Sequence, residues 1–112
     1  MSITLQGVRY EDQHGKWSYC APVNLSMLLS YWGWEGDRED TGPALKPYDR
    51  DKNVMLYEME DYVDEQTELN ALVRYNGDLD LLRTFLSEGF PVLIERGVYE
   101  RDFHGVITWM GH

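Results

Sequence analysis

An apolar segment that runs from the chain's single cysteine, Cys20, to Gly33 constrains the fold more than any other feature of the sequence. Its large apolar side chains recur at the i, i+3, i+4, i+7 spacing of one helix face: Leu25, Leu28, Leu29 and Trp32. Pro22 suits the first turn of a helix, and Gly33 suits the position just after the last turn. We therefore predict a helix from about Pro22 to Gly33 with one buried face.

Cys20 lies directly before this helix, where unpaired backbone N–H groups and the helix dipole favour an anion. The thiolate is the nucleophilic form of cysteine, and such settings can lower the pKa of a thiol well below the roughly 8.5 of free cysteine. A lone cysteine is also frequently a small, buried, structural residue. The cysteine alone therefore leaves a nucleophilic and a structural interpretation open.

The size and the charge of the chain exclude several classes of protein. With 112 residues, it is long enough for one domain with a modest core, over residues 1–112. Its formal net charge of −10 argues against a nucleic-acid partner and against electrostatic binding to an anionic membrane. No apolar run is long enough to span a bilayer, so we expect no membrane insertion.

The single cysteine and the first residues indicate a compartment. One cysteine cannot form an internal disulfide, which favours a reducing environment. Residues 1–5 lack the charged-then-apolar pattern of a signal peptide. We therefore expect a cytoplasmic protein, while secretion of a longer parent chain stays open. The acidic stretch from Glu58 to Glu68 is interpreted as a solvated helix face, because it lacks the spacing of a calcium-binding loop.

Periodicity and turn residues predict the remaining elements. After an extended lead-in over 3–10, we expect a loop over 36–51 with at most one short helical turn after Thr41. The further predicted elements are a helix from an Asn53 cap to Glu65, a strand over 69–75, a helix over 79–88 capped by Asp78, a buried strand over 91–95, a polar excursion over 97–105 and a strand over 106–109. This order predicts an α+β protein in which a helical layer packs on a small antiparallel sheet.

Three side chains outside the helix are candidates to act with Cys20. The amide of Gln13, on the loop that leads into the helix, could join the Cys20 backbone N–H in an oxyanion hole. His104 and His112 both follow at a distance near predicted strands, and either could be the general base. His14 lies in a polar turn and is expected to be solvated.

Three segments resemble a known family in the order in which they occur. The segment from Tyr19 to Gly33, the Gly-Phe-Pro-Val-Leu-Ile-Glu segment over 89–95 and the closing Trp-Met-Gly-His over 109–112 resemble papain-like cysteine peptidases of the bacteriocin-processing, double-glycine leader type. The resemblance implies a papain-like fold, a peptide or protein substrate and no cofactor or metal. It implies that Cys20 is the nucleophile, that Gln13 contributes to the oxyanion hole and that His112, preceded by Gly111, is the base in preference to His104.

The sequence departs from the family pattern at three points. Gln13 lies one residue further from Cys20 than is usual, and Ala21 replaces the usual glycine. The strand and the Asp or Asn that follow the base in the family have no counterpart here, because the chain stops at His112. We therefore expect an N-terminal fragment of a longer domain with weak or no turnover, and an exposed sheet edge through which it could form a homo-oligomer.

Two alternatives remain. The first is a non-catalytic peptide-binding or assembly module on the same scaffold. The second is a metal site formed by Cys20 with histidines, which is less favoured because no pair has ligand spacing on one element.

Overall fold

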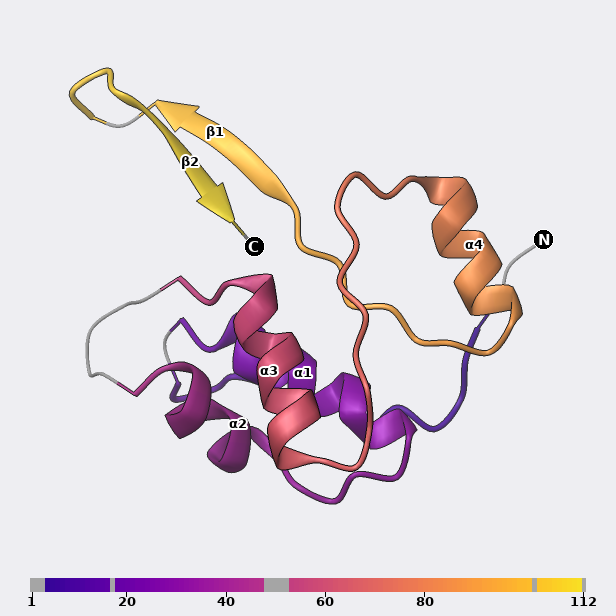
Figure 1. The fold of residues 1–112 in the computed structure, drawn as a ribbon. Helices are drawn as coiled ribbons and strands as arrows, with labels where there is room; N and C mark the ends of the chain where they lie inside the picture. Colours follow the sequence, from indigo (N-terminus) through magenta and orange to yellow (C-terminus); the bar gives the residue numbers. More distant parts are fainter. Residues whose placement is uncertain (1–3, 17, 48–52, 102, 112) are drawn as a thin grey trace.

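The computed structural model describes residues 4–16, 18–47, 53–101 and 103–111. In chain order its elements are α1 (Cys20–Tyr31), α2 (Arg38–Leu45), α3 (Leu56–Gln66), α4 (Leu79–Ser87), β1 (Gly97–Arg101) and β2 (Ile107–Gly111). Helices α1, α2 and α3 gather in one body, while α4 lies to one side and the β1–β2 hairpin projects away (Figure 1).

Helix α1 confirms the predicted helix, and Leu25 and Leu29 of the predicted face are buried, whereas Trp32 lies just after the helix end and is 48% exposed. It begins at Cys20, two residues before Pro22, and it ends where Gly33 takes a φ of +87°. Glycine adopts this left-handed conformation at little steric cost. The backbone N–H of Gly33 donates to the Ser30 carbonyl at 3.0 Å, which closes the last turn.

The core lies where α1, α2 and α3 meet. It consists of six buried side chains: Leu25, Leu29, Leu45, Met59, Tyr62 and Val63. Burying one such large apolar side chain stabilises a fold by about 1.5–3 kcal/mol. Helix α3 begins after Met55 and not after Asn53, because the Glu58 carboxylate accepts from the Met55 N–H at 3.1 Å. Of the acidic residues predicted to form a solvated face, Asp61, Asp64, Glu65 and Glu68 are exposed, whereas Glu58 and Glu60 are partly buried.

Helix α2 occupies a stretch predicted to be mostly loop. The Asp37 side chain accepts from the Glu39 N–H at 2.8 Å, and the Asp40 side chain accepts from the Asp37 N–H at 2.9 Å. These reciprocal bonds form a capping box and satisfy N–H groups that a helix start otherwise leaves unpaired. Pro43, which suggested a loop, lies inside the helix. Burial of Leu45 and Thr41 against the rest of the body outweighs the hydrogen bond that proline removes.

Helix α4 confirms the prediction of a capped helix after the Asn76 turn. The Asp78 carboxylate accepts from the Leu81 N–H at 2.8 Å, and Gly89 ends the helix with a φ of +86°. No residue of α4 is buried. Contacts just after its end join it to α1, where the Tyr31 hydroxyl donates to the Gly89 carbonyl at 2.7 Å.

The predicted α+β fold is wrong, and with it the papain-like arrangement of helices on a sheet. Within the described ranges the strands form one antiparallel hairpin, in which Gly97 of β1 pairs with Gly111 of β2, and no helix packs on it as a layer (Figure 1). Residues 69–75 and 91–95, both predicted as strands, belong to no sheet, and the second, predicted to be buried, has Val92 and Ile94 exposed. Alternation of side chains favours an extended backbone, whereas a sheet also requires a neighbouring strand in register. The hairpin has that neighbour close in sequence, and β1 includes part of the predicted polar excursion.

Candidate functional site

Cys20 is the first residue of α1, and its thiol is partly exposed and not in a disulfide. The residue before it, Tyr19, occupies the cap position, and no side chain caps the helix there. The first turn also contains no acidic residue. An uncapped helix start with unpaired N–H groups favours an anion. The Cys20 region therefore combines an accessible thiol with backbone donors that no carboxylate occupies.

The chain approaches Cys20 through an unusual backbone conformation at Ser18. Ser18 has a φ of +59°, in the left-handed region that few non-glycine residues adopt. Its carbonyl accepts from the Lys46 ammonium at 2.6 Å. Lys46 follows α2 directly and is only 9% exposed, so its charge is held close to this turn.

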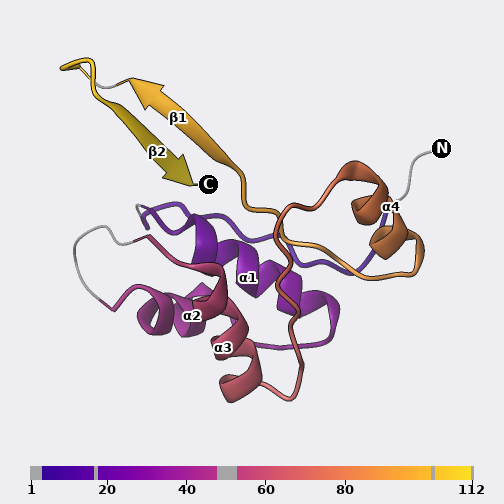
Figure 2. The same ribbon diagram turned by 45° about the horizontal axis from the view of Figure 1, so that its top comes forward.

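Helix α2 contacts the Cys20 turn at two further points. The hydroxyl of Thr41, which is fully buried, donates to the Pro22 carbonyl at 2.8 Å. Gly42 faces the ring of Tyr19 so closely that a Cβ atom at position 42 would lie under 3.0 Å from the ring. Figure 2 shows α2 alongside the first part of α1. These contacts bracket Cys20 on both sides in the sequence.

Gln13 lies in a turn that is attached to the same region. The Gln13 carbonyl accepts from the Lys16 N–H at 2.8 Å, and the Lys16 ammonium lies 5.7 Å from the centre of the Tyr19 ring. The guanidinium of Arg38, at the start of α2, donates to the Asp12 carbonyl at 2.7 Å. The turn with Gln13 is thus held beside the residue that precedes Cys20. The Gln13 side chain itself is exposed, and the Cys20 thiol makes no hydrogen bond among the described residues.

The two described histidines do not form a catalytic pair with Cys20. His14 is exposed in the turn after Gln13. His104 is exposed in the connection between β1 and β2, where its ring meets the edge of Phe103 at 5.6 Å. That connection is the end of the hairpin remote from the helices, whereas β2 runs back toward them in both views (Figures 1 and 2). His112, the base that the resemblance implies, lies outside the described residues.

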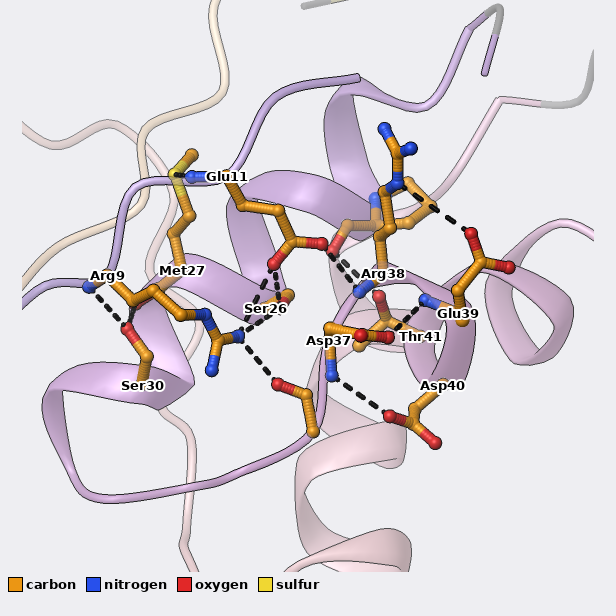
Figure 3. Close-up of polar contacts among 12 residues, drawn as sticks. Arg9, Glu11, Ser26, Met27, Ser30, Asp37, Arg38, Glu39, Asp40 and Thr41 are labelled. Atoms are coloured by element: carbon orange, nitrogen blue, oxygen red, sulfur yellow. Dashed lines mark hydrogen bonds and ion pairs between the residues drawn. The ribbon is translucent and has the colours of Figure 1, made fainter. Parts of the chain in front are cut away.

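A separate polar cluster ties the N-terminal segment to α1 and α2 (Figure 3). One oxygen of Glu11 accepts from the Ser26 hydroxyl at 2.7 Å, and the other accepts from the Arg38 N–H at 2.6 Å. The Arg9 guanidinium donates to the Gly36 carbonyl at 2.6 Å, and its backbone N–H donates to the Ser30 hydroxyl at 2.9 Å. Through its two carboxylate oxygens, Glu11 attaches the N-terminal segment to α1 and to α2.

Sequence reasoning did not identify Lys46 and Thr41 as part of the Cys20 region. The sequence signal that could have located them is the Asp37–Asp40 pair. Its spacing is that of a capping box, which predicts a helix start at Arg38. With α2 predicted, Thr41 and Gly42 would have been placed on one helix, and Lys46 directly after it.

The described residues contain neither a cluster of metal ligands nor a membrane-spanning helix, and the chain matches no known protein. Within the ranges that the structure describes, no group of three or more His, Cys, Asp or Glu side chains is placed to hold a metal ion. Among the same residues, no helix has both the length and the apolar character that crossing a bilayer requires. No family model matches the chain, and neither a curated protein nor a solved structure is similar to it.

Proposed function

We propose that this chain is a cysteine peptidase-like hydrolase in which Cys20 is the nucleophile and a peptide or protein is the substrate. The observation that carries the proposal is the partly exposed thiol at a helix start with no side-chain cap and no acidic residue in its first turn. Unpaired N–H groups at a helix start can donate to an anion such as the oxyanion of acyl transfer. The proposal concerns the chemistry of Cys20 and does not include the papain-like fold.

The reaction would proceed by acyl transfer. The Cys20 sulfur forms a bond to the peptide carbonyl carbon while a base takes the thiol proton, and the carbonyl oxygen becomes an oxyanion. The Cys20 N–H and the Gln13 amide donate to that oxyanion. The C–N bond then breaks as the base returns the proton to the leaving amine, and water hydrolyses the thioester.

His112 is the proposed base and His104 the alternative. The direction of β2 supports this order, because β2 runs back toward the helical body while the connection with His104 lies at the far end of the hairpin (Figure 2). A reducing compartment such as the cytoplasm is part of the proposal, because the nucleophile must stay a thiol.

The test is the rate at which iodoacetamide alkylates Cys20, measured between about pH 5 and pH 9 across the range where cysteine reactivity changes. Because Cys20 is the single cysteine, one mass shift reports it without ambiguity. The same chain unfolded in urea is the matched control, since it carries the same thiol without the helix. We expect the folded chain to react faster than the unfolded chain, because unpaired N–H groups at a helix start favour an anion.

Two results would bear on this proposal in opposite directions. Equal rates for folded and unfolded chain at every pH would refute an activated nucleophile. A faster folded rate, together with cleavage of a fluorogenic peptide library that disappears in Cys20→Ala, would support hydrolysis.

A non-catalytic assembly module is the second candidate, and a different observation favours it. The extended segments expose large apolar side chains on their outer faces, with Leu72 80% and Ile94 61% exposed. Both edges of the two-stranded hairpin are open, and an isolated hairpin is only marginally stable in water. A second copy of the chain is the proposed partner for these segments.

A further inference from the structure

We propose that the Asn76-Gly77 pair is a site of spontaneous modification, at which the Asn76 side chain cyclises onto the main chain and is converted to aspartate and isoaspartate. The co-reactant is water. The pair lies directly before Asp78, which caps α4. The inference is independent of the function proposed for Cys20, and no step of it involves the thiol.

The reaction joins the side-chain amide of an asparagine to the main-chain nitrogen of the next residue. The Gly77 nitrogen loses its proton and forms a bond to Asn76 Cγ, while the bond from Cγ to the amide nitrogen breaks and ammonia leaves with that proton. The product is a cyclic succinimide. Water opens this ring at Cγ to give aspartate, or at the main-chain carbonyl carbon to give isoaspartate, in which the main chain continues through the former side chain.

The first support is the residue that follows Asn76. The chain has four asparagines, and Asn76 is the one followed by glycine. The other three precede residues with side chains: Asn24 precedes leucine, Asn53 valine and Asn70 alanine. A side chain on the following residue hinders the approach of its nitrogen to Cγ, whereas glycine has no Cβ and rotates more freely about φ and ψ. The sequence therefore favours cyclisation at Asn76 over the other asparagines.

The second support is that the fold leaves both reacting groups accessible. Residues 74–80 are all exposed. Among the residues that the structure describes, neither the Asn76 side chain nor the Gly77 N–H makes a hydrogen bond. By contrast, the Asn24 amide donates to the Cys20 carbonyl at 2.7 Å within α1, which holds that side chain on the helix. The Asn76 bend can therefore rotate into the geometry of attack without breaking a hydrogen bond or leaving the core.

The third support is that glycine is not required at position 77 for the fold. A Cβ atom there would meet Leu81 Cδ2 at 3.9 Å, which is an ordinary van der Waals contact. Gly77 is also not one of the glycines with a positive φ. Gly77→Ala therefore fits the folded chain, and it changes the reactivity of the pair without removing the asparagine.

The experiment follows the full chain during incubation in mildly alkaline buffer, which favours loss of the Gly77 proton, and in mildly acidic buffer. Peptide mapping by mass spectrometry measures the rate at which each asparagine is deamidated. Labelling by an isoaspartyl methyltransferase reports the isoaspartate product. The wild type is compared with Asn76→Gln, with Gly77→Ala and with Asn70→Gln, the matched control at another exposed asparagine. The wild type in urea gives the rate without the fold.

We expect deamidation at Asn76 to be severalfold faster than at any other asparagine, and faster in the alkaline buffer. The rate in the folded chain should be close to the rate in urea, because the exposed bend is not protected by the fold. Gly77→Ala should slow the reaction severalfold. Asn76→Gln should abolish it, because the longer side chain cyclises far more slowly, and Asn70→Gln should leave it at the wild-type rate.

Equal rates at Asn76 and Asn70 in the folded wild type would overturn the inference, and so would a wild-type rate in Gly77→Ala. A rate at Asn76 that is much lower in the folded chain than in urea would overturn it as well, because the bend would then be held against cyclisation. Circular dichroism checks that each variant is folded. If Gly77→Ala does not fold, the comparison of Asn76 with Asn70 within the wild type decides.

Discussion

At the scale of single residues, Ser18, in a left-handed conformation, lies two residues before Cys20, and its carbonyl accepts from the ammonium of Lys46, which follows α2. Cys20 was identifiable from the sequence because it precedes an apolar helix, whereas Lys46 was not, since nothing local marks a lysine as buried. The Lys46–Ser18 hydrogen bond at 2.6 Å joins residues far apart in the chain. The surroundings of Cys20 thus have a local part, the helix start, and a long-range part, the contacts with α2.

One residue of the core gives the molecule a predictable response to high pH. Burial, with a smaller contribution from the nearby Asp40 carboxylate, raises the pKa of Tyr62 above its ordinary value of 10.0. Both effects disfavour the phenolate in the folded state. Below about pH 10 the phenol is protonated in both states, so its contribution to the free energy of unfolding is intact. As the pH rises through the raised pKa, the unfolded state loses the proton first, and that contribution is lost.

We therefore expect the free energy of unfolding to fall more steeply above about pH 10 in the wild type than in Tyr62→Phe, which keeps the ring and lacks the ionising group. Urea unfolding followed by circular dichroism between about pH 8 and pH 11 measures the difference. The same pH dependence in both proteins would contradict the assignment to Tyr62.

At the scale of elements, α2 is the helix that contacts the turn around Cys20, and its start is stabilised by the Asp37 capping box. The Asp37 side chain accepts from the Glu39 N–H at 2.8 Å. We expect Asp37→Ala to lower the free energy of unfolding by about 1 kcal/mol, as is typical for loss of a helix cap, and Asp37→Asn to retain most of it. Urea unfolding at neutral pH provides the measurement.

Asp64→Ala, at an exposed carboxylate in α3, controls for the loss of one negative charge and should change stability by less than about 0.5 kcal/mol. An effect of Asp37→Ala no larger than that of Asp64→Ala would mean that the cap does not stabilise α2.

Some helices could be predicted from local sequence signals alone, and others could not. Helix α4 was predictable because Asp78 and Gly89 supply a cap at each end, and α1 because its apolar spacing is regular. The start of α3 was predicted after Asn53, which was wrong. Met55 occupies the cap position, and its N–H donates to the Glu58 carboxylate. Helix α2 was missed because Pro43 predicts a break, and only packing against α1 and α3 outweighs that local preference.

At the scale of the whole molecule, the chain is less compact than a typical domain of its length. Its radius of gyration is 15.2 Å, whereas about 13 Å is expected for this number of residues. The hairpin and α4 extend from the helical body and account for the difference (Figure 1). Extended segments with exposed apolar side chains are therefore prominent on the surface.

This surface leads to a prediction about self-association. We expect the chain to associate with rising concentration, and more strongly at high salt, because the net charge of −10 repels copies and salt screens that repulsion. Ile94→Lys should weaken association by placing a charge on the outer apolar face. Sedimentation velocity at low and high sodium chloride measures both effects.

Ser87→Lys, at an exposed position at the end of α4, is the control that adds the same charge elsewhere. A monomer under all conditions, or equal association of wild type and Ile94→Lys, would exclude an assembly role for this face.

The sequence by itself determined where α1 and α4 form and that Cys20 stands at a helix start, because helix periodicity and caps act over a few neighbouring residues. For residues 69–75 and 91–95 the sequence predicted strands, and this prediction was wrong. Only the tertiary structure decided that these segments form no sheet, that α2 exists despite Pro43, and that Lys46 reaches the turn before Cys20. Each of these outcomes depends on a partner distant in the chain, and the free energy of such contacts is absent from any local pattern.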